Sequence, residues 1–158
     1  MQDLSHLDPQ GHATMVDITG KKETKRLAIA KGRIYMMPET LALIDSGGVK
    51  KGEVYSVARI AGIMGAKKTA DLIPLCHPLP IQSVSIDLKS NTSENCIDIT
   101  AIASLYGRTG IEMEALTAVA ISALVIFDMC KAVDKGMKVT DVRLIHKSGG
   151  KSGTFNAD

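Results

Sequence analysis

Aromatic residues are scarce in this chain: they make up 3% of its 158 residues, and tryptophan is absent. The core must therefore be built mainly from isoleucine, leucine, valine, alanine and methionine. The formal net charge of +2 is too small to indicate a nucleic-acid partner. A chain of this length is the usual size of one compact domain with a sizeable core.

Cysteines are also few. Cys76, Cys96 and Cys130 show neither zinc-site spacing nor a disulfide framework, so we expect a reduced, cytoplasmic setting and no protein-bound metal. The first residues have no basic start and no apolar run, and we expect no signal peptide. The longest apolar stretch, residues 115–127, is shorter than the ~18 residues of a membrane span. We expect a buried helix there and no membrane partner.

Hydrophobic periodicity predicts an α+β domain. The strands are expected at residues 24–37, 81–88, 96–105 and 139–146, the middle two forming a β-hairpin. The helices are expected at residues 38–44, 52–70 and 110–133. The apolar side of the second helix is predicted to hold Val54, Val57, Ala58, Ala61 and Met64. Removing one helix from this β-α-α-β-β-α-β order leaves the ferredoxin-like pattern, with helices on one face of an antiparallel sheet.

Three parts follow from this assignment. We expect a mobile N-terminal segment at 1–14, one ferredoxin-like catalytic domain at 15–148 and a flexible Gly/Lys/Ser tail at 149–158. The helix at 110–133 is apolar on most of its circumference. It therefore needs a second neighbour beyond its own sheet, and oligomerisation is the simplest way to supply one.

The segment from Asp71 to Pro80 holds His77 among three prolines. Proline fixes φ and pushes the preceding residue out of the α region, which predicts a stiff, extended connector. Such a connector holds a side chain at a fixed angle, as catalysis requires. A helix stop followed by a buried neutral histidine explains the same pattern, and this segment alone does not separate the two. Cys76 and His77 should point to opposite sides, which argues against a thiol–imidazole pair.

Asp128 and Lys131 lie three residues apart near the end of the long helix, so they share a face. They form either an ordinary ion pair or an acid/base pair, and apolar neighbours that predict partial burial favour the second interpretation. Glu114 lies on the same helix, ~21 Å away at ~1.5 Å per residue. If both ends serve one small substrate, the site must be built across a subunit interface.

Basic residues gather beside glycines and at the predicted ends of elements, as in Lys51-Gly52, 107–110 and 147–151. Glycine lets a backbone approach an anion, and a helix N-terminus favours negative charge, so the grouping predicts a phosphate-bearing ligand. Residues 150–152 match the end of a P-loop. Because position 145 is Ile instead of Gly and no helix can follow, a P-loop NTPase is excluded.

Several runs, read together, resemble the MoaC family of molybdenum cofactor biosynthesis. The most specific runs are LIPLCHPL at 72–79, GIEMEALTA at 110–118, DMCKAV at 128–133 and KSGGKSG at 147–153. Shorter matches are MVD at 15–17, KGEV at 51–54 and ARIAGI at 58–63, so the resemblance covers residues 15–153. Arg108 stands where a lysine is also familiar, which keeps the charge but changes the donor geometry.

The resemblance implies a lyase. Its substrate would be a cyclised dihydroguanosine triphosphate made by a preceding radical enzyme, and its products cyclic pyranopterin monophosphate and pyrophosphate. The assembly would be a hexamer, a trimer of dimers, with sites at the dimer interface. No organic cofactor is implied, and Mg²⁺ would enter only with the substrate phosphates.

The resemblance also assigns residues to roles. Asp128 and Lys131 would be the acid/base pair, and Glu112 would orient the base or a water. Substrate binding would involve Leu75, Cys76, His77, Met113 and Glu114. The triphosphate would be held by Lys51, Lys67, Lys147 and Arg26.

Two rival functions remain. A non-catalytic ferredoxin-like module could sense a nucleotide without turnover, and it would not need Asp128 beside Lys131. An RNA-binding sheet is disfavoured, because such sheets stack bases on aromatic rings and the hairpin strands offer only Tyr106.

Overall fold

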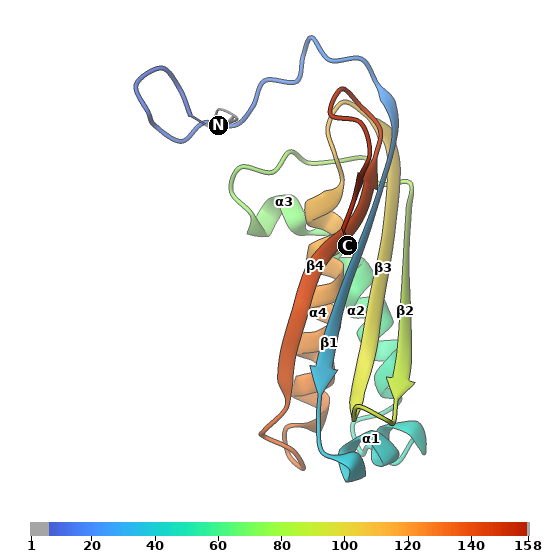
Figure 1. The fold of residues 1–158 in the computed structure, drawn as a ribbon. Helices are drawn as coiled ribbons and strands as arrows, with labels where there is room; N and C mark the ends of the chain where they lie inside the picture. The colour runs from blue at the N-terminus through green and yellow to red at the C-terminus, as the bar shows by residue number, and fades with distance from the viewer. Residues whose placement is uncertain (1–6, 158) are drawn as a thin grey trace.

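The computed structural model describes residues 7–157. Its elements are β1 Thr24–Tyr35, α1 Pro38–Asp45, α2 Val54–Lys67, α3 Thr69–Leu72, β2 Ser83–Asn91, β3 Cys96–Gly107, α4 Glu112–Cys130, β4 Lys138–Ser148 and β5 Phe155–Asn156. Figure 1 shows long strands running beside α4, with α1 at one end of the molecule and α3 toward the other. Residues 1–6 of the predicted N-terminal segment lie outside the described residues.

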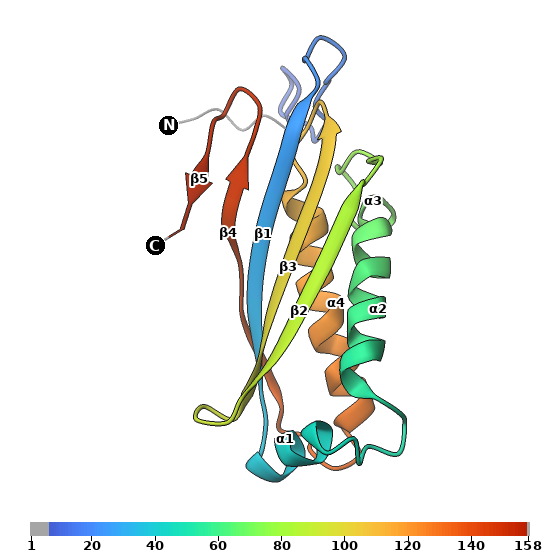
Figure 2. The ribbon, with the colours of Figure 1, turned by 90° about the vertical axis from the view of Figure 1, so that its right-hand side faces the viewer.

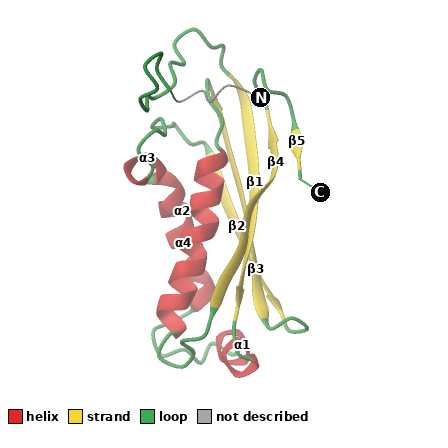
Figure 3. Ribbon diagram, turned by 60° about the vertical axis from the view of Figure 1, so that its left-hand side comes forward, coloured by secondary structure: helices red, strands yellow, loops and turns green. Residues whose placement is uncertain are grey.

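All five strands form one antiparallel sheet in the order β2-β3-β1-β4-β5. Helices α2 and α4 cover one face, and the other face is open (Figures 2 and 3). This confirms the predicted α+β class with helices on one side of an antiparallel sheet. Four of the strands keep the ferredoxin-like order β4-β1-β3-β2, to which β5 adds a short edge strand that the sequence did not predict.

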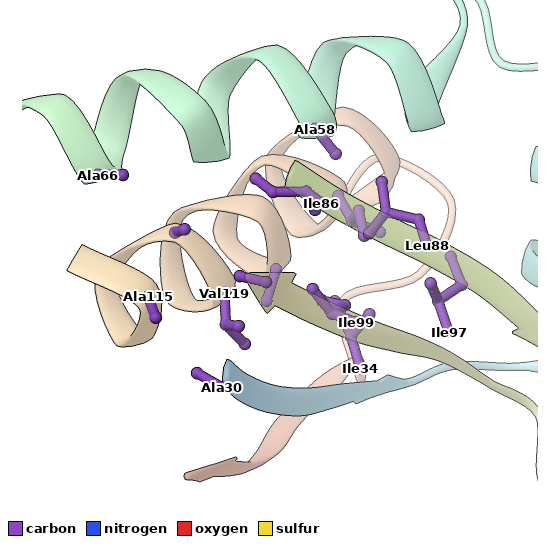
Figure 4. Packing of buried hydrophobic residues seen from close by; sticks show 14 of the residues in the cluster. Ala30, Ile34, Ala58, Ala66, Ile86, Leu88, Ile97, Ile99, Ala115 and Val119 are labelled. Atoms are coloured by element: carbon purple, nitrogen blue, oxygen red, sulfur yellow. The ribbon is translucent and has the colours of Figure 1, made fainter. Parts of the chain in front are cut away.

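Strand β3 supplies much of the core because its apolar residues alternate. Ile97, Ile99, Ala101, Ala103 and Leu105 are all at most 1% exposed. Figure 4 shows Ile97 and Ile99 grouped with residues of β1, β2 and α4. Full burial of a large aliphatic side chain stabilises a fold by about 1.5–3 kcal/mol, so this alternation fixes which face of the strand packs on the helices.

The packed face of α2 differs from the prediction. Val57 and Met64 were expected inside but are 42% and 58% exposed, whereas Gly62 and Gly65 are buried against α4. A Cβ on Gly62 would overlap side-chain atoms of Ser122, and one on Gly65 would overlap Ile121. The absence of side chains allows the two helices to approach closely, and this close contact turns the bulkier residues of α2 outward.

Two helix boundaries also differ. The predicted helix to residue 70 is divided into α2 and α3 at Lys68, where Thr69 donates its hydroxyl to the carbonyls of Gly65 and Ala66 at 3.2 and 2.9 Å. Helix α4 ends at Cys130, so Lys131 caps the helix instead of lying inside it.

By length and composition, α4 is long and apolar enough to cross a membrane. Half of its apolar stretch is buried within this chain, where α4 packs against α2 and the sheet. It is a core helix, as the sequence predicted.

Candidate functional site

A hollow of about 380 Å³ opens where the N-terminal end of α4 meets the proline-rich loop after α3. We call it the α4 hollow. Its lining includes the six side chains that the resemblance groups around the substrate: Leu75, Cys76, His77, Glu112, Met113 and Glu114. Val16, Ile18 and Lys21 complete one wall, and the sequence did not single them out as site residues. The structure therefore brings these six predicted substrate-binding residues together and adds the N-terminal segment to them.

His77 fastens that segment to the loop. Its Nε2 lies 2.8 Å from the carbonyl oxygen of Val16. Because a carbonyl can only accept, Nε2 carries the hydrogen, and in the neutral ring Nδ1 is left as an acceptor. The hydrogen bond holds the imidazole at a fixed angle, as both a substrate-binding histidine and a structural one would require.

Two glutamates on the first turn of α4 have different surroundings. Glu112 accepts a hydrogen bond from Lys147 Nζ at 2.9 Å, whereas Glu114 is only 3% exposed. Burial raises the pKa of Glu114 to about 7, and the nearby Glu112 charge adds to the rise. Glu114 can therefore gain or lose a proton near neutral pH.

Cys76 lies in the same hollow as a free thiol. Burial raises the pKa of this thiol, and the Glu114 charge raises it further. Both effects disfavour the thiolate, the form in which a cysteine acts as a nucleophile.

A second hollow of about 210 Å³ adjoins the first and shares Lys21, Thr109, Gly110 and Glu112 with it. We call it the anion seat, because five cationic side chains line it against the single carboxylate of Glu112. The cationic residues are Lys21, Arg26, Arg108, Lys147 and Lys151. The N-terminal end of α4 adds the partial positive charge of the helix dipole. Charge and backbone geometry together make this hollow fit for phosphate groups.

Asp128 lies at the other end of α4. Its carboxylate is 2.7 Å from Lys131 Nζ and 3.2 Å from Lys51 Nζ, and Lys51 also donates to the Asp128 carbonyl at 2.7 Å. Hydrogen bonds and charge from Lys131 and then Lys51 lower the pKa of Asp128. The expectation of partial burial was wrong: the Asp128 side chain is 59% exposed, because the residues that follow it, Met129 and Cys130, occupy the buried side of the helix.

The four cations predicted to hold the triphosphate do not form one group. Arg26 and Lys147 line the anion seat, Lys51 contacts Asp128 at the far end of α4, and Lys67 is exposed in the last turn of α2. Glu114 and Asp128 are separated by ~21 Å along one helix. One small substrate cannot touch both ends within a single chain.

No group of three or more His, Cys, Asp or Glu residues within the described range 7–157 is placed to hold a metal ion. A further hollow of about 550 Å³ lies on the open face of the sheet. Its charged lining is of both signs and contains none of the residues predicted for the site: Lys31, Arg33, Asp87, Lys89, Asp98, Asp141 and Arg143.

Comparison with known proteins identifies the family. The chain is 58% identical over 158 residues to the cyclic pyranopterin monophosphate synthase of Dinoroseobacter shibae, covering 100% of both chains. It is 56% identical over 154 residues to the synthase of the same name from Rhodospirillum rubrum, covering 98% of this chain and 93% of the other. The synthase of Thermomicrobium roseum is 52% identical over 158 residues, covering 100% and 95%. The MoaC family model matches residues 15–150, and the chain therefore belongs to the MoaC family.

Proposed function

We propose that this chain is a lyase of molybdenum cofactor biosynthesis, which converts a cyclised dihydroguanosine triphosphate to cyclic pyranopterin monophosphate and releases pyrophosphate. The three relatives described above are named as that synthase, and the chain aligns with almost the whole length of each. The observation that carries the proposal is the continuity of the α4 hollow with the anion seat. A flat base joined to a triphosphate needs two adjoining places of this kind.

In this proposal the base occupies the α4 hollow. Leu75 and Met113 offer apolar contacts, while His77 and Glu114 offer hydrogen-bonding groups. The triphosphate lies in the anion seat, where Lys147 and Lys151 reach it from the strand and loop after Ile145. These lysines stabilise the charge that develops as pyrophosphate leaves. Mg²⁺, where present, binds through the substrate phosphates.

Asp128 and Lys131 supply the acid/base chemistry. Opening and rebuilding a purine ring requires repeated proton transfers, and a lysine held by a carboxylate is suited to them. Lys51, which also contacts Asp128, adds a second charge close to the reacting atoms. Because this group lies ~21 Å from Glu114, we propose that it reaches the α4 hollow of a partner subunit.

The outward side of α2 supports assembly with a second copy. Val57, Ile60 and Met64 are exposed there at 42%, 60% and 58%, and Leu124 of α4 is exposed at 56%. Apolar residues recurring on one side of a helix are typical of a contact surface. We propose a homohexamer built as a trimer of dimers, acting in the cytoplasm.

The catalytic proposal is tested by incubating the purified protein with the cyclised dihydroguanosine triphosphate. Pyrophosphate and an oxidised fluorescent pterin are measured for the wild type, Lys131→Ala and Asp128→Ala. We expect both products with the wild type and neither with the variants, while Lys135→Ala, an exposed lysine beyond the helix end, stays active. Tight binding without products in the wild type would favour the nucleotide-sensing module.

Subunit mixing tests the shared site. Lys131→Ala and His77→Ala chains are each expected to be inactive alone. If one site draws on two chains, co-expressed mixtures regain about a quarter of wild-type activity, because half of randomly paired dimers hold one intact site out of two. No recovery in assemblies shown to be mixed would place the whole site within one chain.

A further inference from the structure

Arg26 of β1 directs its guanidinium at backbone oxygens. Its Nε donates to the carbonyl of Gly107 at 3.3 Å, its Nη2 to Arg108 at 3.2 Å and its Nη1 to Gly149 at 3.1 Å. A guanidinium offers five N–H donors in a rigid, planar fork. Three separate directions of that fork are therefore committed to main-chain carbonyls.

The three carbonyls belong to two loops that meet at the anion seat. Gly107 ends β3, and Arg108 begins the loop that leads to the N-terminal end of α4. Gly149 lies in the loop between β4 and β5, which carries Lys151 and Ser152 into the same hollow. Arg26 thus joins the loop that presents the helix N-terminus to the loop that presents the lysine.

The packing of the second loop depends on the same guanidinium. Gly149 and Gly150 adopt φ of 99° and 77°, a region that side chains disfavour. A Cβ on Gly149 would overlap the carbonyl of Lys25, and one on Gly150 would overlap the Arg26 guanidinium. The glycines let the loop lie directly against β1 and the flat guanidinium.

We infer that Arg26 is a positioning residue for the pyrophosphate-binding part of the site: it fixes two loops relative to each other and acts on phosphate through them. This differs from the role of direct phosphate ligand that the resemblance implies. It rests on the proposed function for the identity of the anion. Lysine keeps the positive charge but offers three donors on a single nitrogen, so it cannot hold three carbonyls arranged around a plane.

Charge-conserving replacement separates the two roles. We expect Arg26→Lys to behave like Arg26→Gln, with the substrate KM and the inhibition constant of inorganic pyrophosphate both raised about tenfold and kcat changed much less. Arg33→Lys serves as the control. Arg33 lies on the same strand and pairs with the carboxylates of Glu94 and Asp98, and a lysine at position 33 can also pair with a carboxylate. An Arg26→Lys enzyme with wild-type KM and pyrophosphate inhibition would overturn the inference.

A glycine pair tests the guanidinium position without changing any charge. Gly150→Ala should displace the guanidinium and raise the pyrophosphate inhibition constant as Arg26→Gln does. Gly153→Ala has the same kind of backbone strain, at φ of 70°, but nothing lies within 4 Å of its Cβ, so its effect should be much smaller. If Gly150→Ala and Gly153→Ala raised the pyrophosphate inhibition constant equally, backbone strain would explain the loss of binding, and the inference would be contradicted.

Calorimetric titration with inorganic pyrophosphate keeps the inference distinct from the catalytic proposal. A wild-type protein that binds pyrophosphate but forms no pterin would refute the catalytic proposal, while the comparison with Arg26→Lys would still test positioning. An active wild type and an Arg26→Lys variant with unchanged pyrophosphate affinity would refute positioning alone.

Discussion

Glu114 should make this protein less stable as the pH rises from about 4.5 to about 7. Its carboxyl is buried at 3% exposure, and burial raises its pKa from 4.5 to about 7. Between these two pH values the folded protein keeps a proton that the unfolded chain has released. Stability therefore falls with increasing pH in this window, and replacement by the neutral isostere glutamine should remove the fall.

The size of the effect follows from the two pKa values. A difference of about 2.5 corresponds to about 3 kcal/mol per chain at 1.36 kcal/mol for each pH unit. At pH 4 the wild type and Glu114→Gln should have similar unfolding free energies, since the carboxyl is protonated in both states. At pH 8 the variant should be more stable by about 3 kcal/mol, although it loses the proton-exchanging group.

Urea denaturation at fixed protein concentration, from pH 4 to pH 8, measures this difference. Glu112→Gln is the matched control on the same helical turn. It removes the ion pair with Lys147 but leaves the Glu114 carboxyl buried, and burial is the main cause of the raised Glu114 pKa, so the fall in stability with pH should remain. Parallel stability curves for the wild type and Glu114→Gln would show that Glu114 ionises normally. The argument from burial would then be wrong.

Three further outcomes follow from the packing and charges. Gly62→Ala should lower the unfolding free energy, measured by urea denaturation, by about 1–3 kcal/mol, because the added methyl group would enter the contact between α2 and α4. Gly20→Ala, whose methyl group would lie in open space, should change it little. Asp134→Ala should cost about 2 kcal/mol in thermal denaturation, because the buried Asp134 carboxylate accepts from the Met37 N–H at 2.8 Å; an unchanged midpoint would refute this. Lys147→Ala should weaken substrate binding more at low salt than at high salt, and an unchanged binding constant would remove it from the phosphate site.

Much of the fold could be predicted because strand alternation is a local signal. Ile97, Ile99, Ala101, Ala103 and Leu105 recur at every second position, and the same residues form the core in the structure. The packed face of α2 could not be predicted in this way. A hydrophobic pattern counts Val57 and Met64 as interior, but the contact with α4 is set by the absence of side chains at Gly62 and Gly65.

The site shows a similar division. Residues 72–79 and 110–118 match the MoaC family most specifically, and the structure brings several of their side chains into one hollow. What the sequence could not supply were contacts between distant segments: Lys51 with Asp128, Val16 with His77, and Arg26 with three carbonyls. Neither local periodicity nor residue type encodes such partners, because they depend on how the sheet and loops come together.

In the proposed function, helix α4 holds substrate-binding residues at one end and the acid/base pair at the other, so its length matters as much as its composition. Inserting one residue between Glu114 and Asp128 would turn the far end by about 100° and shift it by about 1.5 Å. A partner subunit that meets Asp128 and Lys131 at one angle would then face a different side of the helix. In a library of insertions and deletions, this helix should therefore be among the least tolerant segments of the chain. The turn at residues 92–95 lies at the opposite end of the sheet from both hollows, and it should accept extra residues.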